Sequence, residues 1–175
     1  SLDLSYFEAT ELEFNIETTS NDNYLKSHKI KSAITNNNSL LNSFVSMKGN
    51  KENLNIEAKV EAYEDLTKDK DSDKYQYLLP SFELSKSFNN NLTLVSNGYN
   101  KNYETNIFEK VLINDLKYTS SPKIIANGLI KKLNFLIKNV TTEGENSNEY
   151  SNDLRSQNFG SILYDLSFPC LLYTS

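Results

Sequence analysis

Few residues in this sequence have the types and spacing that support catalysis or metal binding. The chain contains one His and one Cys, which are too few for a Cys/His zinc site or an internal disulfide. His28 is flanked by Lys26 and Lys29 without a Ser or Cys nucleophile motif nearby, so a surface histidine is expected rather than a general base. The acidic run Lys68–Asp73 lacks the Gly and the closing Glu of a calcium-binding loop. No catalytic, cofactor-binding or metal-binding residue is predicted, and the chain is not expected to be an enzyme.

The charge distribution and the lengths of the apolar runs exclude two further classes. A net charge of −5 arises from 18 basic and 23 acidic residues that are spread along the chain without a basic stripe, so nucleic acid is not an expected partner. No apolar run approaches the ~20 residues that a membrane-spanning helix needs. Asn-rich clusters such as Asn89–Asn91 recur at intervals typical of strands separated by turns.

The clearest structural signal is a strict alternation within Asn53–Tyr63. One set of alternate residues is apolar: Leu54, Ile56, Ala58, Val60 and Ala62. The set between them is polar: Asn55, Glu57, Lys59 and Glu61. A period of two places one face of an extended strand against apolar material and the other against water. Looser alternation occurs in four other segments: Leu12–Ile16, Leu41–Met47, Phe82–Phe88 and Phe159–Phe168. Over the whole chain we predict eight or nine strands.

Turn-forming residues predict where these strands end. Long polar connections are expected at Lys68–Asp73 and Glu143–Asp153, with further turns at Asn89–Asn91 and Asn97–Asn102. Pro80 cannot donate a ladder hydrogen bond, so it predicts either a kink within a strand or the first residue of a strand that begins near Ser81. The second role is preferred.

The segment 122–140 fits two interpretations. Its apolar residues recur at helical spacing after Ser121-Pro122, which is a good helix start. Asn127-Gly128, however, is a strong hairpin signal, and one face of a strand interrupted by Lys131 is also fitted by Leu129, Leu133, Phe135 and Ile137. Local pattern alone does not separate the helix from the strand.

The predicted fold class is therefore all-β, an antiparallel meander of about eight or nine strands. Short and long loops alternate, and several Tyr and Phe residues lie near predicted strand ends, as in the aromatic girdles of transmembrane β-barrels. A soluble β-sandwich would also show alternation, because each of its sheets hides one face against the other.

Several short stretches resemble the barrel domain of the LptD family, the lipopolysaccharide-assembly proteins of the outer membrane that are also called organic solvent tolerance proteins. The resemblance is carried by the following segments: Tyr63–Leu66, Lys74–Phe82 (KYQYLLPSF), Asn114–Ser120 (NDLKYTS), Asn134–Val140 (NFLIKNV) and Leu166–Pro169. Nearly the whole chain is covered, but each motif is short and none is a catalytic signature. The cysteine pairs of the family are not seen here.

This resemblance implies that residues 1–169 are part of a large transmembrane β-barrel in the outer membrane of a Gram-negative bacterium. Residues 170–175 (CLLYTS) resemble the translated adapter tail of sequencing reads and are expected to be non-native. The family resemblance also implies lipopolysaccharide, outer-membrane lipid and an LptE-like plug lipoprotein as partners, and a strand for the ambiguous segment. Leu54, Ile56, Ala58, Val60 and Ala62 would then face lipid, and Asn55, Glu57, Lys59 and Glu61 would face the lumen. In isolation such a piece would be an open curved sheet. The alternatives are a small free-standing outer-membrane barrel and a soluble β-sandwich binding module.

Overall fold

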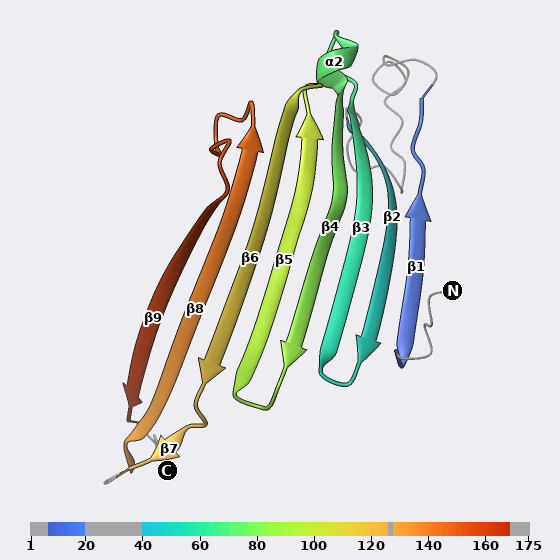
Figure 1. Ribbon diagram of the computed structural model, residues 1–175. Coiled ribbons are helices and arrows are strands. Elements are labelled where there is room, and N and C mark those ends of the chain that lie inside the picture. The colour runs from blue at the N-terminus through green and yellow to red at the C-terminus, as the bar shows by residue number, and fades with distance from the viewer. Residues whose placement is uncertain (1–6, 20–39, 126–127, 169–175) are drawn as a thin grey trace, which may run out of the picture.

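The computed structural model describes residues 7–19, 40–125 and 128–168, which form one antiparallel sheet (Figure 1). The nine strands are β1 (Ala9–Asn15), β2 (Leu40–Lys51), β3 (Leu54–Asp65), β4 (Tyr75–Ser87), β5 (Leu92–Tyr103), β6 (Ile107–Thr119), β7 (Lys123–Ile124), β8 (Ile130–Glu145) and β9 (Arg155–Ser167). Strands β1 to β6 and β8 follow one another as a meander, and both β7 and β9 pair with β8. The predicted all-β class and meander are confirmed.

The ambiguous segment forms strands β7 and β8, so the helix interpretation of residues 122–140 is wrong. Strand β8 pairs with β6 from Phe108↔Glu145 to Thr119↔Asn134, and its other edge pairs with β9. Hydrogen bonding along both edges satisfies the backbone of β8. The apolar residues of β8 recur at helical spacing, but they lie in a strand and not in a helix.

The long connections gather at one end of the sheet, called here the long-loop end. They are residues 66–74, which contain the short helix α2 (Asp71–Lys74), and residues 146–154. The turns at 52–53 and 88–91 lie at the opposite, short-turn end (Figure 1). The predicted turn at Asn97–Asn102 is wrong, because these residues lie inside β5 and pair with β4 and β6. The turn occurs instead at the long-loop end after Tyr103, where Glu104 and Thr105 have positive φ angles of 49° and 65°.

Pro80 lies within β4, so the preferred prediction that it begins a strand is wrong. The registers of β4 with β3 and with β5 both shift beside it, between Lys59 and Glu61 on β3 and between Leu78 and Ser81 on β4. A missing N–H and a locally interrupted ladder are what a proline causes in a strand. Pro80 therefore lies at an irregularity of pairing inside the strand, and the predicted kink stays a prediction.

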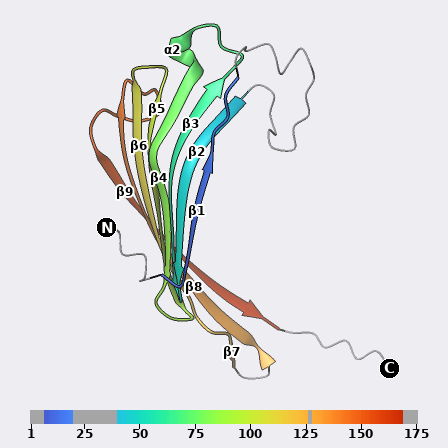
Figure 2. The same cartoon turned by 90° about the vertical axis from the view of Figure 1, so that its right-hand side faces the viewer.

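Seen edge-on, the strands form a single curved layer (Figure 2). Only three apolar side chains are buried among the described residues: Leu41, Leu66 and Val111. No helix in the described part of the chain is long and apolar enough to cross a membrane. Because a soluble domain is stabilised by a buried apolar core, this sheet requires an apolar partner on one of its faces.

Some predictions fall on residues that the structure leaves undescribed. They concern the surface position of His28, the tail at 170–175 and Asn127 of the hairpin signal Asn127-Gly128. These stay predictions.

Candidate functional site

The two predicted sets of residues on β3 lie on opposite faces of the sheet. Directly opposed residues in paired strands point to the same side. Val60 is opposite Val45 on β2, and Ala58 is opposite Phe82 on β4. We call this side the aliphatic face. Lys59, opposite Ser46, lies on the other side, which we call the polar face.

At several positions the exposure of the two faces runs in the opposite sense to that of a soluble sheet, although Leu41 on the aliphatic face is buried. On the aliphatic face Phe14 is 72% exposed, Val45 52% and Val60 45%. On the polar face Ser46 is 2% exposed, Glu61 7% and Glu109 2%. Burial of polar groups with exposure of apolar ones indicates that the polar face is the inner side of the curved sheet.

The apolar residues of the aliphatic face form a belt that crosses the strands obliquely. A row perpendicular to the strands joins Phe14 on β1, Val45 on β2 and Val60 on β3. Continued past the register shift in β4, the same row meets polar side chains, Lys110 on β6 and Glu143 on β8. The apolar residues of the later strands lie nearer the short-turn end. The aliphatic belt is centred on Phe14 (β1), Val45 (β2), Ala58 (β3), Phe82 (β4), Leu94 (β5), Phe135 (β8) and Tyr164 (β9). On β6 its residues are Leu116 and Tyr118, which Asn114 separates from Leu112 and Phe108 on the same face.

The slope of the aliphatic belt follows from this register. Between β2 and β8 the belt moves from the row of Val45, which contains Glu143 on β8, to Phe135. With ~3.3 Å per residue along a strand and ~4.8 Å between strands, a shift of about eight residues over about five strand spacings inclines the belt by roughly 45° to the strands. Strands of transmembrane barrels are tilted by ~35–45° from the barrel axis, which sets them at ~45–55° to the apolar band.

A ladder of polar side chains borders the aliphatic belt on the long-loop side. Ser96 Oγ donates to Asn114 Oδ1 (2.7 Å), and Asn114 Nδ2 donates to Asn139 Oδ1 (3.4 Å). Asn139 Nδ2 in turn donates to Asn158 Oδ1 (2.8 Å) and Ser156 Oγ (2.9 Å). On β5, β8 and β9 the aliphatic belt therefore ends at this row of hydrogen-bonded side chains, whereas on β6 Leu112 and Phe108 lie beyond it.

Predicted girdle tyrosines divide between the two faces. Tyr77 is opposite Ala62, so Tyr75 and Tyr77 lie on the aliphatic face at the long-loop end, where their rings stack with centroids 6.3 Å apart. Tyr118, opposite Leu92, lies on this face toward the short-turn end. Tyr63 and Tyr103 lie on the polar face instead. Tyrosines therefore lie toward both ends of the strands on the aliphatic face, but Tyr63 and Tyr103 do not contribute to it.

The polar face carries paired charges. Lys59 Nζ lies 2.7 Å from Glu61 Oε1, the Tyr63 hydroxyl donates to the same oxygen (2.8 Å), and Lys59 Nζ also lies 4.3 Å from the centre of the Phe44 ring. Further along, Asp115 Oδ2 lies 3.3 Å from Lys138 Nζ. Both signs of charge are interspersed, so this face is hydrophilic without a strong net field.

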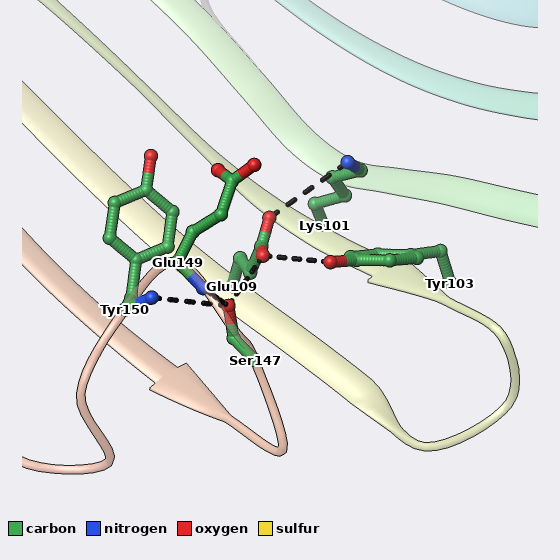
Figure 3. Close-up of polar contacts among 6 residues, drawn as sticks. All are labelled: Lys101, Tyr103, Glu109, Ser147, Glu149 and Tyr150. Atoms are coloured by element: carbon green, nitrogen blue, oxygen red, sulfur yellow. Dashed lines mark hydrogen bonds and ion pairs between the residues drawn. The ribbon is translucent and has the colours of Figure 1, made fainter.

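The most enclosed polar cluster surrounds Glu109 near the long-loop end of the polar face (Figure 3). The Tyr103 hydroxyl (2.9 Å) and Ser147 Oγ (2.7 Å) both donate to Glu109 Oε1, and Lys101 Nζ lies 3.8 Å from Glu109 Oε2. Lys101 and Tyr103 come from β5, and Glu109 comes from β6, whereas Ser147 comes from the β8–β9 connection. These contacts compensate the cost of burying the carboxylate.

Sequence reasoning missed this cluster. Lys101 on β5 is paired with Glu109 on β6 across the turn that joins the two strands. Because a turn was predicted at Asn97–Asn102, no strand pairing was expected for Lys101. The alternation of β6, in which Glu109 follows Phe108 and precedes Lys110, gives no local sign of burial. Only placing the turn at 104–106 could have found the pair.

A cavity of about 330 Å³ adjoins the cluster and shares Tyr103. Its other lining residues include Tyr63, Gln76, Asp73 and Lys68, so it is bounded by tyrosine rings, an amide and charges of both signs. The described residues contain no group of three or more His, Cys, Asp or Glu side chains that could hold a metal ion.

Comparisons with known proteins add no assignment. No family model matches the chain, no curated protein is similar to it, and no solved structure matches its fold.

Proposed function

We propose that this chain forms part of the wall of an outer-membrane β-barrel, with its aliphatic face against lipid and its polar face lining a hydrated path. Lipid would provide the apolar partner that the single-layer sheet lacks. In this role the chain forms a wall and lines a path, and it does not catalyse a reaction. Leu54, Ile56, Ala58, Val60 and Ala62 face lipid in this proposal, and Asn55, Glu57, Lys59 and Glu61 face the lumen.

The inclined aliphatic belt carries the proposal. A belt inclined by roughly 45° becomes horizontal once the strands tilt as they do in membrane barrels. Polar groups at its margin, such as the asparagine ladder and the Lys110–Glu143 pair (3.0 Å), would then lie level with lipid headgroups.

The polar face suits a path for amphipathic molecules with large hydrophilic heads. Ion pairs at Glu61, Glu109 and Asp115 present fixed charges of both signs along it, while the backbone groups of the strands are satisfied within the sheet. The sequence resemblance to the LptD family supports lipopolysaccharide as that molecule and an LptE-like lipoprotein as the occupant of the lumen.

The lipid contact is tested with single tryptophans, because the chain contains none. Val45 and Phe44 are adjacent on β2 but lie on opposite faces at the same depth. In vesicles of phospholipids brominated on their acyl chains, Val45→Trp fluorescence should be strongly quenched, whereas Phe44→Trp fluorescence should stay near its value in unbrominated vesicles.

Equal quenching of the two variants, or stronger quenching of Phe44→Trp, would refute the assignment of the faces. A monodisperse protein that stays soluble without detergent and does not associate with the vesicles would favour the soluble β-sandwich module instead. Water-soluble acrylamide provides the complementary measurement, since it should quench Phe44→Trp more than Val45→Trp.

A further inference from the structure

We propose that residues 146–153 form a strap that folds onto the polar face, is anchored there by Glu109, and narrows the path along that face. This inference rests on the proposed function in taking the polar face as the lining of a path. The fold of the strap itself is independent of that function.

The anchor on the wall is the buried carboxylate of Glu109. Tyr103 and Lys101 hold this side chain from β5, so it is positioned by the wall itself. Figure 3 draws three interactions to Glu109, and the one that comes from the strap is the hydrogen bond of Ser147. The hydrogen bond of 2.7 Å from Ser147 to a carboxylate is of the stronger, charge-assisted kind.

Ser147 also organises the strap internally. Its Oγ accepts the backbone N–H groups of Glu149 (3.0 Å) and Tyr150 (3.2 Å), so one hydroxyl joins the turn of the strap to the wall. A second contact ties the base of the strap to the β5–β6 turn, where Asn146 Nδ2 donates to the carbonyl oxygen of Asn106 (2.9 Å).

Gly144 permits the strap to lie flat on the polar face. This residue of β8 is opposite Glu109, and its N–H donates to the carbonyl oxygen of Ser151 (2.8 Å). A Cβ at Gly144 would lie 2.8 Å from Tyr150 Cβ and 2.9 Å from Ser147 Cβ. The absence of a side chain at this position is therefore required for the closed strap.

The arrangement makes the strap a device that can open. Its polar contacts with the wall are those with Glu109 and Asn106, the bond from the Gly144 N–H to the Ser151 carbonyl oxygen, and a hydrogen bond between the side chains of Tyr150 and Tyr99. Releasing them breaks no strand pairing. A hydroxyl group from a passing molecule could replace the Ser147 hydroxyl on Glu109 without leaving the carboxylate unpaired. Local openings of this kind are detected by amide hydrogen exchange.

The test is hydrogen exchange of the strap peptide in the full chain, in detergent micelles. Ser147→Ala removes the bond to Glu109 and should speed exchange of the strap amides roughly tenfold, since a hydrogen bond to a charged group is lost. Ser151→Ala is the matched control, because the Ser151 hydroxyl accepts only the N–H of Asp153 (3.3 Å) within the strap. It should leave exchange of residues 146–150 unchanged.

A double-mutant cycle identifies the anchor. In a Glu109→Ala background, Ser147→Ala should speed exchange less than it does in the wild type, because it then removes only the bonds to the Glu149 and Tyr150 N–H groups and no longer the bond to the wall. Equal exchange in Ser147→Ala and Ser151→Ala would overturn the strap, and an undiminished effect in the Glu109→Ala background would overturn Glu109 as its anchor.

If Glu109→Ala does not fold, Gly144→Ala replaces it. The added methyl group should displace the strap sterically while Glu109 stays intact, and unchanged exchange of the strap amides would count against the proposal. None of these results depends on lipid contact, so the strap and the proposed function fail separately.

Discussion

Replacing Val60 by lysine should destabilise the membrane-inserted chain by about 2–4 kcal/mol, the cost of a cationic side chain near the midplane of a lipid-facing barrel surface. Val60 is 45% exposed and lies opposite Val45 within the aliphatic belt. On a water-exposed surface the same substitution would change stability by no more than about 0.5 kcal/mol. Urea unfolding of the chain in phospholipid vesicles measures the difference.

Asn100→Lys is the matched control for Val60→Lys. Asn100 lies on the same face, opposite Lys110 on β6, but outside the aliphatic belt because the belt has by then moved toward the short-turn end. This variant should unfold at nearly the wild-type urea concentration. Equal destabilisation by the two lysines would argue against an inclined belt, and a neutral Val60→Lys would argue against lipid contact altogether.

Gly98→Ala should lower the free energy of unfolding by about 1–3 kcal/mol, as overpacking does in a closely packed site. A Cβ at this position would lie 2.7 Å from the carbonyl oxygen of Val111 and 3.0 Å from Cε1 of Phe82. The Phe82 ring covers the glycine from the neighbouring strand, in the manner of aromatic rings that shield glycines in sheets. Equilibrium unfolding by urea gives the value.

Gly160→Ala is the control for the glycine effect. Nothing lies within 4 Å of a Cβ built at Gly160 on β9. Because Gly in a strand is ~0.5–1 kcal/mol less favourable than Ala, this variant should be neutral or slightly more stable. A destabilised Gly160→Ala or an unaffected Gly98→Ala would show that the packing around Phe82 is not as described.

The sequence predicted the parts of the fold that depend on side-chain alternation. Asn53–Tyr63 predicted β3 and the separation of Val60 from Lys59, because a period of two sets the face of each residue whatever its neighbours are. The apolar residues of β8 were compatible with both a helix and a strand. The structure resolves them through pairing with β6 and β9, which local spacing does not contain.

The remaining features depend on register between strands, which the sequence alone did not provide. Asn97–Asn102 has turn-forming residues, yet it lies between two partner strands that satisfy its backbone. The burial of Glu109 and the slope of the aliphatic belt both follow from that register. A one-residue slip would move each side chain to the other face, so neither feature was accessible before the turns were placed.

Strand β9 lies at the edge of the sheet, and its outer row of amide and carbonyl groups has no partner among the described residues. All 13 residues of β9 are exposed, including Phe159 and Ile162. Hydrocarbon cannot solvate such groups, and each one left unmatched costs several kcal/mol. When the sheet enters a bilayer, another strand should therefore pair with the open edge of β9. Membrane insertion and this strand pairing should occur together, as one cooperative event.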